Sequence, residues 1–559
     1  MKNRWALTCI GLILTAACAR PPAPAVPTAN VAARSAEEVP HFEGLGPHTR
    51  KVTTNVPEAQ RYFDQGLAFL YGFNHAEAIR AFTKAADLDP RCAMAWWGIA
   101  YASGPHINNS VVPPEREAAG FEAAARARDL AASGTAVEKA LIEAVSARFA
   151  SPQPSDRGPL DRAFAAAMGK VAAAHPGDAD VGALHAESLM DLHPWDLWRH
   201  DGTPQPWTPP IVAQLEQVLA VAPSHPLATH LYIHAVEASP DPGKADAAAD
   251  ALRNLMPSVG HMVHMPSHID VRRGRWQEAI LANTKAMKAD DEYRALFPKQ
   301  DFYRIYMAHN HHMRAFAAMM VGRSELALAS VREMISKIPE DWLKSYALAA
   351  DGWVAMPLEV MMRFGQWEGI LAEPEPPDYL PFSRSLRHYA RGVAYAATGK
   401  VEEARGEQRA FQEQRAKVAP EATFGNNKSQ ALLDVAEKVL EGEILIRAGR
   451  IDAGLAALRE GVQKEDALVY SEPPDWIQPV RHPLGAALLE AGRHAEAESV
   501  FREDLAKLPG NGWALFGMGR ALRLQGKDAE AAEFETRFAA AWKGADVTIT
   551  SPCFCQKGV

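Results

Sequence analysis

Residues 66–90 read GLAFLYGFNHAEAIRAFTKAADLDP, and this stretch decides the fold. Small residues alternate with aromatic ones at helical spacing, so two helices can approach closely while the aromatic rings fill the space between them. A proline ends the second helix. In a frame of 34 residues the key members fall at positions 8, 11, 20, 24, 27 and 32: Gly66, Phe69, Ala78, Phe82, Ala85 and Pro90. The stretch therefore predicts a hairpin of two antiparallel helices.

The same frame recurs along the chain. It fits Gly392, Tyr395 and Ala404, and again Gly485, Ala497, Phe501 and Pro509, although Asp504 breaks position 27 of that unit. This spacing resembles the tetratricopeptide repeat over residues 56–545, and the chain is similar to bacterial lipoproteins of that family. The resemblance implies an all-α, right-handed superhelical solenoid of antiparallel helix pairs. Its concave groove would bind a protein or peptide.

Length and composition agree with a repeat array. The chain has 559 residues, of which 48% are hydrophobic and 23% charged, with a net charge of −9. Dividing the repeat region by 34 and allowing for insertions predicts about ten to thirteen helix pairs. The acidic balance argues against nucleic acid as a partner.

The N-terminus predicts export. Lys2 and Arg4 precede a short apolar run, and residues 15–18 read Thr-Ala-Ala-Cys. We interpret residues 1–17 as a signal peptide, Cys18 as a lipidated cysteine and residues 18–55 as a proline-rich tether. By the resemblance to bacterial lipoproteins, Ala19 implies an anchor in the outer membrane, facing the periplasm, with this anchor as the sole membrane contact. An ordinary secretory peptide with a chance cysteine is the alternative.

Two proline-rich insertions, residues 104–116 and 193–210, interrupt the repeats and are predicted to be non-helical lids. Trp97, Glu187, Trp195 and Trp198 are the candidates for lining a ligand groove beneath them, although aromatic residues in helix pairs more often belong to the core. Residues 546–559 are predicted to be a C-terminal tail. Its Cys553 and Cys555 could bind a soft metal or pair with another chain, a weak hypothesis because two thiols do not make a site.

Histidine is concentrated in the middle of the chain: 12 of the 20 lie between His185 and His312. The repeat frame places a histidine and carboxylate set at positions 2, 5, 9 and 12 of three successive first helices, the positions that line the groove in tetratricopeptide proteins. Pro266 interrupts the second of these helices, so part of that helix could be a loop. The candidate metal ligands are His230, His234, Glu237, His261, His264, His268, His309 and His312.

Imidazole and carboxylate without thiolate suit zinc, copper, iron or manganese. Glu237 is expected to be an anionic ligand or a general base. Further support could come from His185, Glu187 and Asp191 on one helix and from His106, His193, Asp196 and His200 on the lids. Buried histidines are often only hydrogen-bonded core, and an imidazole-lined pocket for an anionic or aromatic ligand is a further alternative.

Three functions therefore stand open: a protein-binding scaffold at the cell envelope, a transition-metal site for storage, delivery or sensing, and a metal-dependent redox or hydrolytic enzyme. The catalytic residues of the last are unknown. No phosphate-binding loop or nucleophile elbow is present in the sequence.

Overall fold

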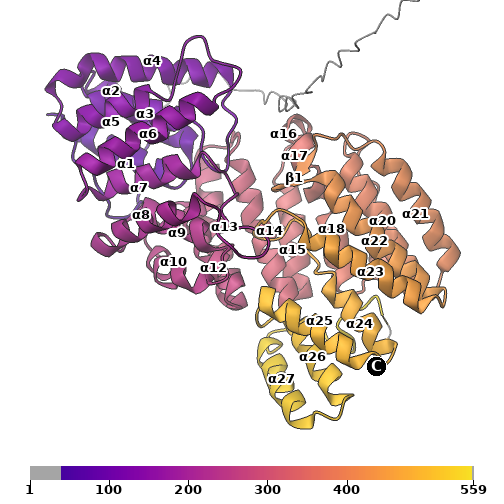
Figure 1. The fold of residues 1–559 in the computed structure, drawn as a ribbon. Coiled ribbons are helices and arrows are strands. Elements are labelled where there is room, and N and C mark those ends of the chain that lie inside the picture. The colour runs from indigo at the N-terminus through magenta and orange to yellow at the C-terminus, as the bar shows by residue number, and fades with distance from the viewer. Residues whose placement is uncertain (1–38, 557–559) are drawn as a thin grey trace, which may run out of the picture.

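A computed structural model describes residues 39–556. Its N-terminal half is built from helices that pack in consecutive hairpins (Figure 1). These are α1 (Pro57–Tyr71), α2 (His75–Leu88), α3 (Ala93–Ser103), α4 (Pro114–Leu130), η2 (Ala131–Ser133), α5 (Ala136–Ser146), α6 (Gly158–Ala174), α7 (Ala179–Met190), α8 (Thr208–Val221), α9 (Pro226–Val236), η3 (Pro242–Ala245), α10 (Asp246–Leu252), α11 (Gly260–His264), α12 (Pro266–Arg272), α13 (Trp276–Leu296) and α14 (Arg304–Met320).

The C-terminal half continues the pattern and adds a two-stranded antiparallel hairpin. Its elements are α15 (Ser324–Ser336), α16 (Glu340–Ser345), α17 (Ala347–Ala350), η4 (Asp351–Ala355), α18 (Met356–Arg363), α19 (Trp367–Ala372), α20 (Pro381–Ala397), α21 (Val401–Arg415), β1 (Thr423–Phe424), β2 (Asn427–Lys428), α22 (Ser429–Arg447), α23 (Ile451–Asp466), α24 (Arg481–Glu490), α25 (His494–Lys507), α26 (Gly512–Arg523) and α27 (Asp528–Ala541). None of the described helices is long and apolar enough to cross a membrane.

The glycines of the repeat frame make the close helix contacts that the frame predicts. A Cβ on Gly66 of α1 or on Gly98 of α3 would lie 2.5 or 2.6 Å from the ring of Phe82, which is fully buried on α2. Phe501 of α25 occupies the same place between Gly485 and Gly517. The predicted all-α architecture of stacked helix pairs is thus confirmed.

The two halves have separate hydrophobic cores, and residues of α13 and α14 contribute to both. These two helices lie between the halves (Figure 1). The last helices return to this junction. Trp276 at the start of α13 donates its indole N–H to the carbonyl of Pro509, and Trp513 of α26 donates to the carbonyl of Met319 on α14. These hydrogen bonds join α13 and α14 to the segment around α26, so the stack folds back on itself.

Residues 39–55 correct the expectation of a tether ending at residue 55. The ring of Phe42 packs on that of Phe69, with 4.9 Å between their centroids. Arg50 forms ion pairs with Asp178 and Asp180 at the start of α7. Apolar and charged side chains with partners in the fold hold this segment against the helices. Residues 1–38, including the predicted signal peptide and Cys18, lie outside the described residues.

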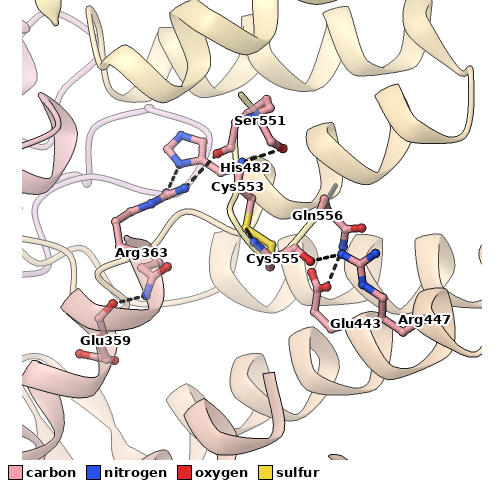
Figure 2. Close-up of a disulfide and its surroundings, with 11 residues drawn as sticks. Glu359, Arg363, Glu443, Arg447, His482, Ser551, Cys553, Cys555 and Gln556 are labelled. Atoms are coloured by element: carbon pink, nitrogen blue, oxygen red, sulfur yellow. Dashed lines mark hydrogen bonds between the residues drawn. A yellow bond between two sulfur atoms is a disulfide. The ribbon is translucent and has the colours of Figure 1, made fainter. Parts of the chain in front are cut away.

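The C-terminal tail also packs, rather than leaving the fold as a tail (Figure 2). Cys553 and Cys555 are buried and joined to each other by a disulfide, so they neither bind a metal nor pair with another chain. Arg363 of α18 donates to the carbonyl of Pro552, and Gln556 donates to Glu443 of α22. Buried hydrogen-bond partners thus fix the segment up to residue 556.

The insertions are non-helical only in part. Residues 104–113 and 193–207 form loops, with backbone bridges between His106 and Asn109 and between Trp198 and Pro204. The prolines that suggested longer loops instead stand in the first turns of α4 and α8. Proline suits this position because the first helical N–H groups have no intrahelical partner.

Buried carboxyl groups predict a stability that falls with rising pH. Burial raises the pKa of Glu359, Glu443 and Glu465 to about 8. In an unfolded chain, glutamate has a pKa of about 4.3. Between these values the folded protein binds more protons than the unfolded chain, so the free energy of unfolding decreases as the pH rises. We expect Tm to be lower at pH 9 than at pH 6, since each of these carboxyls costs the folded state about 1.4 kcal/mol per pH unit between pH 6 and its pKa.

Circular dichroism melts at the two pH values test this expectation. Glu443→Gln should lose less stability between them, because an amide carries no charge and its oxygen can still accept the hydrogen bond from Gln556. The exposed Glu402→Gln is the matched control and should behave as wild type. An equal fall in all three proteins would contradict the assignment.

Candidate functional site

Six histidines from four helices meet in the interior, at the end of the N-terminal half. His230 and His234 lie on α9, His261 and His264 on α11, His268 on α12 and His309 on α14. The first five side chains are at most 5% exposed, and His309 is partly buried. Pro266 begins α12 with Met265 still in helical conformation, so His261 and His264 are helical and do not lie on a loop.

The imidazoles are oriented through their Nδ1 atoms. His230 Nδ1 lies 2.8 Å from the carbonyl of Tyr71, an acceptor, and therefore carries the proton. His264 Nδ1 lies 2.6 Å from Asn283 Oδ1, and the amide nitrogen of Asn283 donates to Ala279 O, which fixes that orientation. Each Nε2 is consequently left with a bare lone pair. Metal-binding histidines are commonly held in this way.

Glu237, the residue that follows α9, orients two more of the rings. Its Oε1 lies 2.7 Å from His234 Nδ1 and its Oε2 lies 2.6 Å from His268 Nδ1. Burial opposes ionisation, but His268 and His234 lower the pKa of Glu237 to about 2. In return the carboxylate raises the pKa of His268 against the effect of burial. Glu237 is thus an ionised acceptor between two imidazoles.

The Nε2 atoms face one another inside the cluster. His230 Nε2 and His261 Nε2 are 3.2 Å apart, and His264 Nε2 and His268 Nε2 are 2.8 Å apart. Burial lowers the pKa of His230, His261 and His264 well below the usual value, so these rings are neutral. Close lone pairs require a proton or a cation between them. A proton on His268 Nε2 satisfies one pair, and a proton on Nε2 of His261, whose Nδ1 has no partner among the described residues, satisfies the other. A metal ion bound in place of either proton would satisfy the same lone pairs.

A small cavity of about 30 Å³ reaches the cluster from one side. His234 and Glu237 form its polar wall, and aromatic side chains from distant segments close it, among them Trp195, Trp198 and Tyr470. Trp195 has a backbone φ of +61°, a strained conformation for a non-glycine residue, and its ring lies edge-on to His234. The space is sufficient for a water-sized or slightly larger ligand.

Loop 193–207 covers this cavity as the predicted lid. His193 stacks on Trp207 with 3.7 Å between ring centroids, and Trp198 donates to the carbonyl of Ala235 on α9. Because the C-terminal half folds back, Tyr470 closes the other side, with its hydroxyl 3.4 Å from Glu237 Oε2. The histidines are therefore enclosed, in contrast to the open concave groove that the repeat frame predicted.

Several candidate residues lie outside this cluster. Trp97 is buried beside Tyr101, and Glu187 accepts the Tyr101 hydroxyl, so neither lines the cavity. His312 lies one turn beyond His309, next to Phe424, and joins no ligand group. The other supporting candidates are engaged elsewhere: His185 with Gln214, Asp191 with Arg148, Asp196 with Gln205, and His106 stacked on His75, while His200 is exposed.

Tyr470 and Glu472 were missed by the sequence reasoning. They lie in the loop between α23 and α24, more than 230 residues from Glu237, and no local motif marks them. A further group, His48, Asp180 and His225, also has ligand-like spacing. Its carboxylate already accepts from both histidines, Tyr71 and Arg50, so this group ties the N-terminal segment to α7.

The fold and site together define an all-α protein of stacked helix pairs with a histidine cluster enclosed in its interior. No protein-family model matches the chain, and no curated protein is significantly similar.

Among solved structures, the human IFIT1 dimer with m7Gppp-AAAA is 12% identical, covering 88% of this chain and 91% of that chain with a TM-score of 0.33. Cut9 in the APC/C complex Cut9–Hcn1 is 12% identical, covering 86% and 76%, with a TM-score of 0.32. Yeast Tom70 is 11% identical, covering 87% and 90%, with a TM-score of 0.29. At these values the likeness carries no argument about function.

Proposed function

We infer that this protein is a cell-envelope scaffold of tetratricopeptide type whose main function is to hold a transition metal in the histidine cluster and to present it to a small ligand. The observation that carries the proposal is the orientation of the rings. His230, His234, His264 and His268 each have Nδ1 bonded to a carbonyl, carboxylate or amide oxygen, so Nε2 is the ring nitrogen that each could offer to a metal. Neutral imidazole Nε2 suits zinc, copper, iron or manganese.

Enclosure supports a small ligand over a peptide at this site. The clustered histidines on α9, α11 and α12 are at most 5% exposed, and the adjoining cavity of about 30 Å³ does not admit a peptide. A protein or peptide partner would therefore bind on the outer surface of the helix stack.

Two features support a location in the cell envelope. The sequence of residues 1–18 resembles a bacterial lipoprotein export signal, and the chain has a disulfide between Cys553 and Cys555. Disulfides persist in oxidising compartments such as the periplasm. We therefore propose that the protein is a lipoprotein of the outer membrane.

A metal-dependent reaction on a small substrate is the second candidate. It is favoured by the cavity, because His234 and Glu237 form part of its wall and an ion bound there would keep a position open to the cavity. Turnover of a substrate would distinguish this candidate from storage, delivery or sensing.

Metal content is the direct test of the proposal. Protein purified from the envelope without a histidine tag is expected to contain stoichiometric transition metal by elemental mass spectrometry. His264→Ala should contain clearly less metal than the wild type, because this ring is fully buried and is held by Asn283 toward His268.

His388→Ala is the matched control, since His388 is bonded to Glu407 far from the cluster, and it should keep the metal. Equal metal content in the wild type and His264→Ala would refute the site. Metal-free wild type that also fails to take up added zinc or copper would return the protein to the scaffold class.

A further inference from the structure

The six histidines divide into two groups of three. The ligand atoms of His230, His234 and His261 all lie within 4.8 Å of one another, and so do those of His264, His268 and His309. Two nitrogens bound to one tetrahedral ion at bonds of about 2.0–2.1 Å are about 3.4 Å apart. Small side-chain movements would therefore close each group on an ion, and three histidines are a common protein complement for a metal that keeps an exchangeable position.

Glu237 connects the two groups without belonging to either. Its carboxylate oxygens accept from Nδ1 of His234 in the first group and from Nδ1 of His268 in the second. The separations of 2.7 and 2.6 Å are hydrogen-bond distances and are shorter than the spacing of two ligands on one ion. A single ion bound by Glu237 and these two Nδ1 atoms would also not use the converging Nε2 atoms as ligands.

On the basis of the proposed metal-binding function, we propose that the cluster is a two-metal centre, with one ion on His230, His234 and His261 and a second on His264, His268 and His309. The two ions share Glu237 as the acceptor that orients one histidine of each group. Only the first ion is reached from the cavity, because the cavity wall contains His234 and no histidine of the second group.

Charge then indicates which external ligand the first ion takes. Two ions would bring at least two positive charges into a buried site whose ionised carboxylate is Glu237, and uncompensated buried charge is costly. Glu472, which accepts from the Tyr470 hydroxyl at 3.1 Å, is a further acid on the side that Tyr470 closes. The rest of the cavity wall contains the ring of His193 and apolar side chains that include Leu197, Met190 and Ile107. The first ion is thus suited to a small anion of a few atoms that enters from the cavity.

Cobalt(II) titration of the metal-free full-length protein tests the two sites separately. The wild type should bind two equivalents by elemental analysis, and added azide should change the visible cobalt spectrum. His261→Gln should bind one equivalent without an azide response. His309→Gln should bind one equivalent and keep the azide response.

Each possible failure has a distinct meaning. One equivalent in the wild type would overturn the two-metal centre and leave the proposed metal function standing, whereas no bound metal would overturn both. An azide response that survives in His261→Gln would overturn the assignment of the cavity to the first ion. The wild-type stoichiometry needs no variant, and circular dichroism of both glutamine variants shows whether they retain the helical fold.

Discussion

Replacing Glu237 with glutamine is expected to lower the affinity for the metal by about 10- to 100-fold, the usual loss when a residue that orients metal-binding histidines is removed. An amide has one acceptor oxygen and one donor group. It can therefore accept from His234 or from His268, but not from both. The ring that loses its acceptor must turn or leave its Nδ1–H unbonded in a buried place, which costs about 1–3 kcal/mol.

Zinc affinity measured by competition with a chelator is the appropriate readout for this variant. Glu216→Gln serves as the control, because Glu216 accepts a hydrogen bond from Tyr232 at 2.8 Å near the same helix but does not contact the cluster. It should bind zinc as the wild type does. If Glu237→Gln also kept wild-type affinity, Glu237 would have no part in orienting the rings.

Phe82→Ala is expected to lower the free energy of unfolding of the N-terminal half by about 3–5 kcal/mol. The ring of Phe82 is fully buried and fills the space that Gly66 and Gly98 leave between α1, α2 and α3. Backbone atoms of three helices surround this space, so it cannot collapse when the ring is removed. The loss combines the transfer of the ring from water with the cavity that stays behind.

Urea unfolding followed by hydrogen exchange distinguishes a local effect from a global one. Because repeat stability is a sum over neighbouring units, protection should fall first in α1 to α3. Leu281→Ala on α13 is the control: this side chain is 55% exposed, and its removal should change stability by no more than about 0.5 kcal/mol. A loss below about 1 kcal/mol for Phe82→Ala would contradict the packing described for the first repeat.

The repeat frame placed the residues within each helix more reliably than it placed the helices relative to one another. Gly66 and Phe82 contact each other as their positions predicted, because the two helices of a hairpin are held together by a short connection. The frame also indicated that histidines of successive repeats face one direction, and six of the seven histidines proposed as ligands lie in the cluster.

His312 shows that a position in the repeat frame does not by itself place a residue in the histidine cluster. It occupies position 5 like His230 and His264, yet its ring lies 6.0 Å from that of Phe424 in the C-terminal half. His312 lies apart from the cluster because α14 belongs to both cores, so its second half contacts residues of the C-terminal half. Trp97 is buried for a related reason, since helix α3 has neighbours on both sides.

The sequence by itself determined the helix pairs, the close glycine–aromatic contacts and the convergence of histidines from three repeats, because all of these depend on the period of one helix and on contacts between neighbours. Only the tertiary structure decided that Glu237 contacts two imidazoles, that six of the candidate histidines form two groups of three, and that Tyr470 closes the cavity. These features depend on the curvature of the whole stack. That curvature is the sum of small rotations between neighbouring helix pairs, and no single segment of the sequence encodes it.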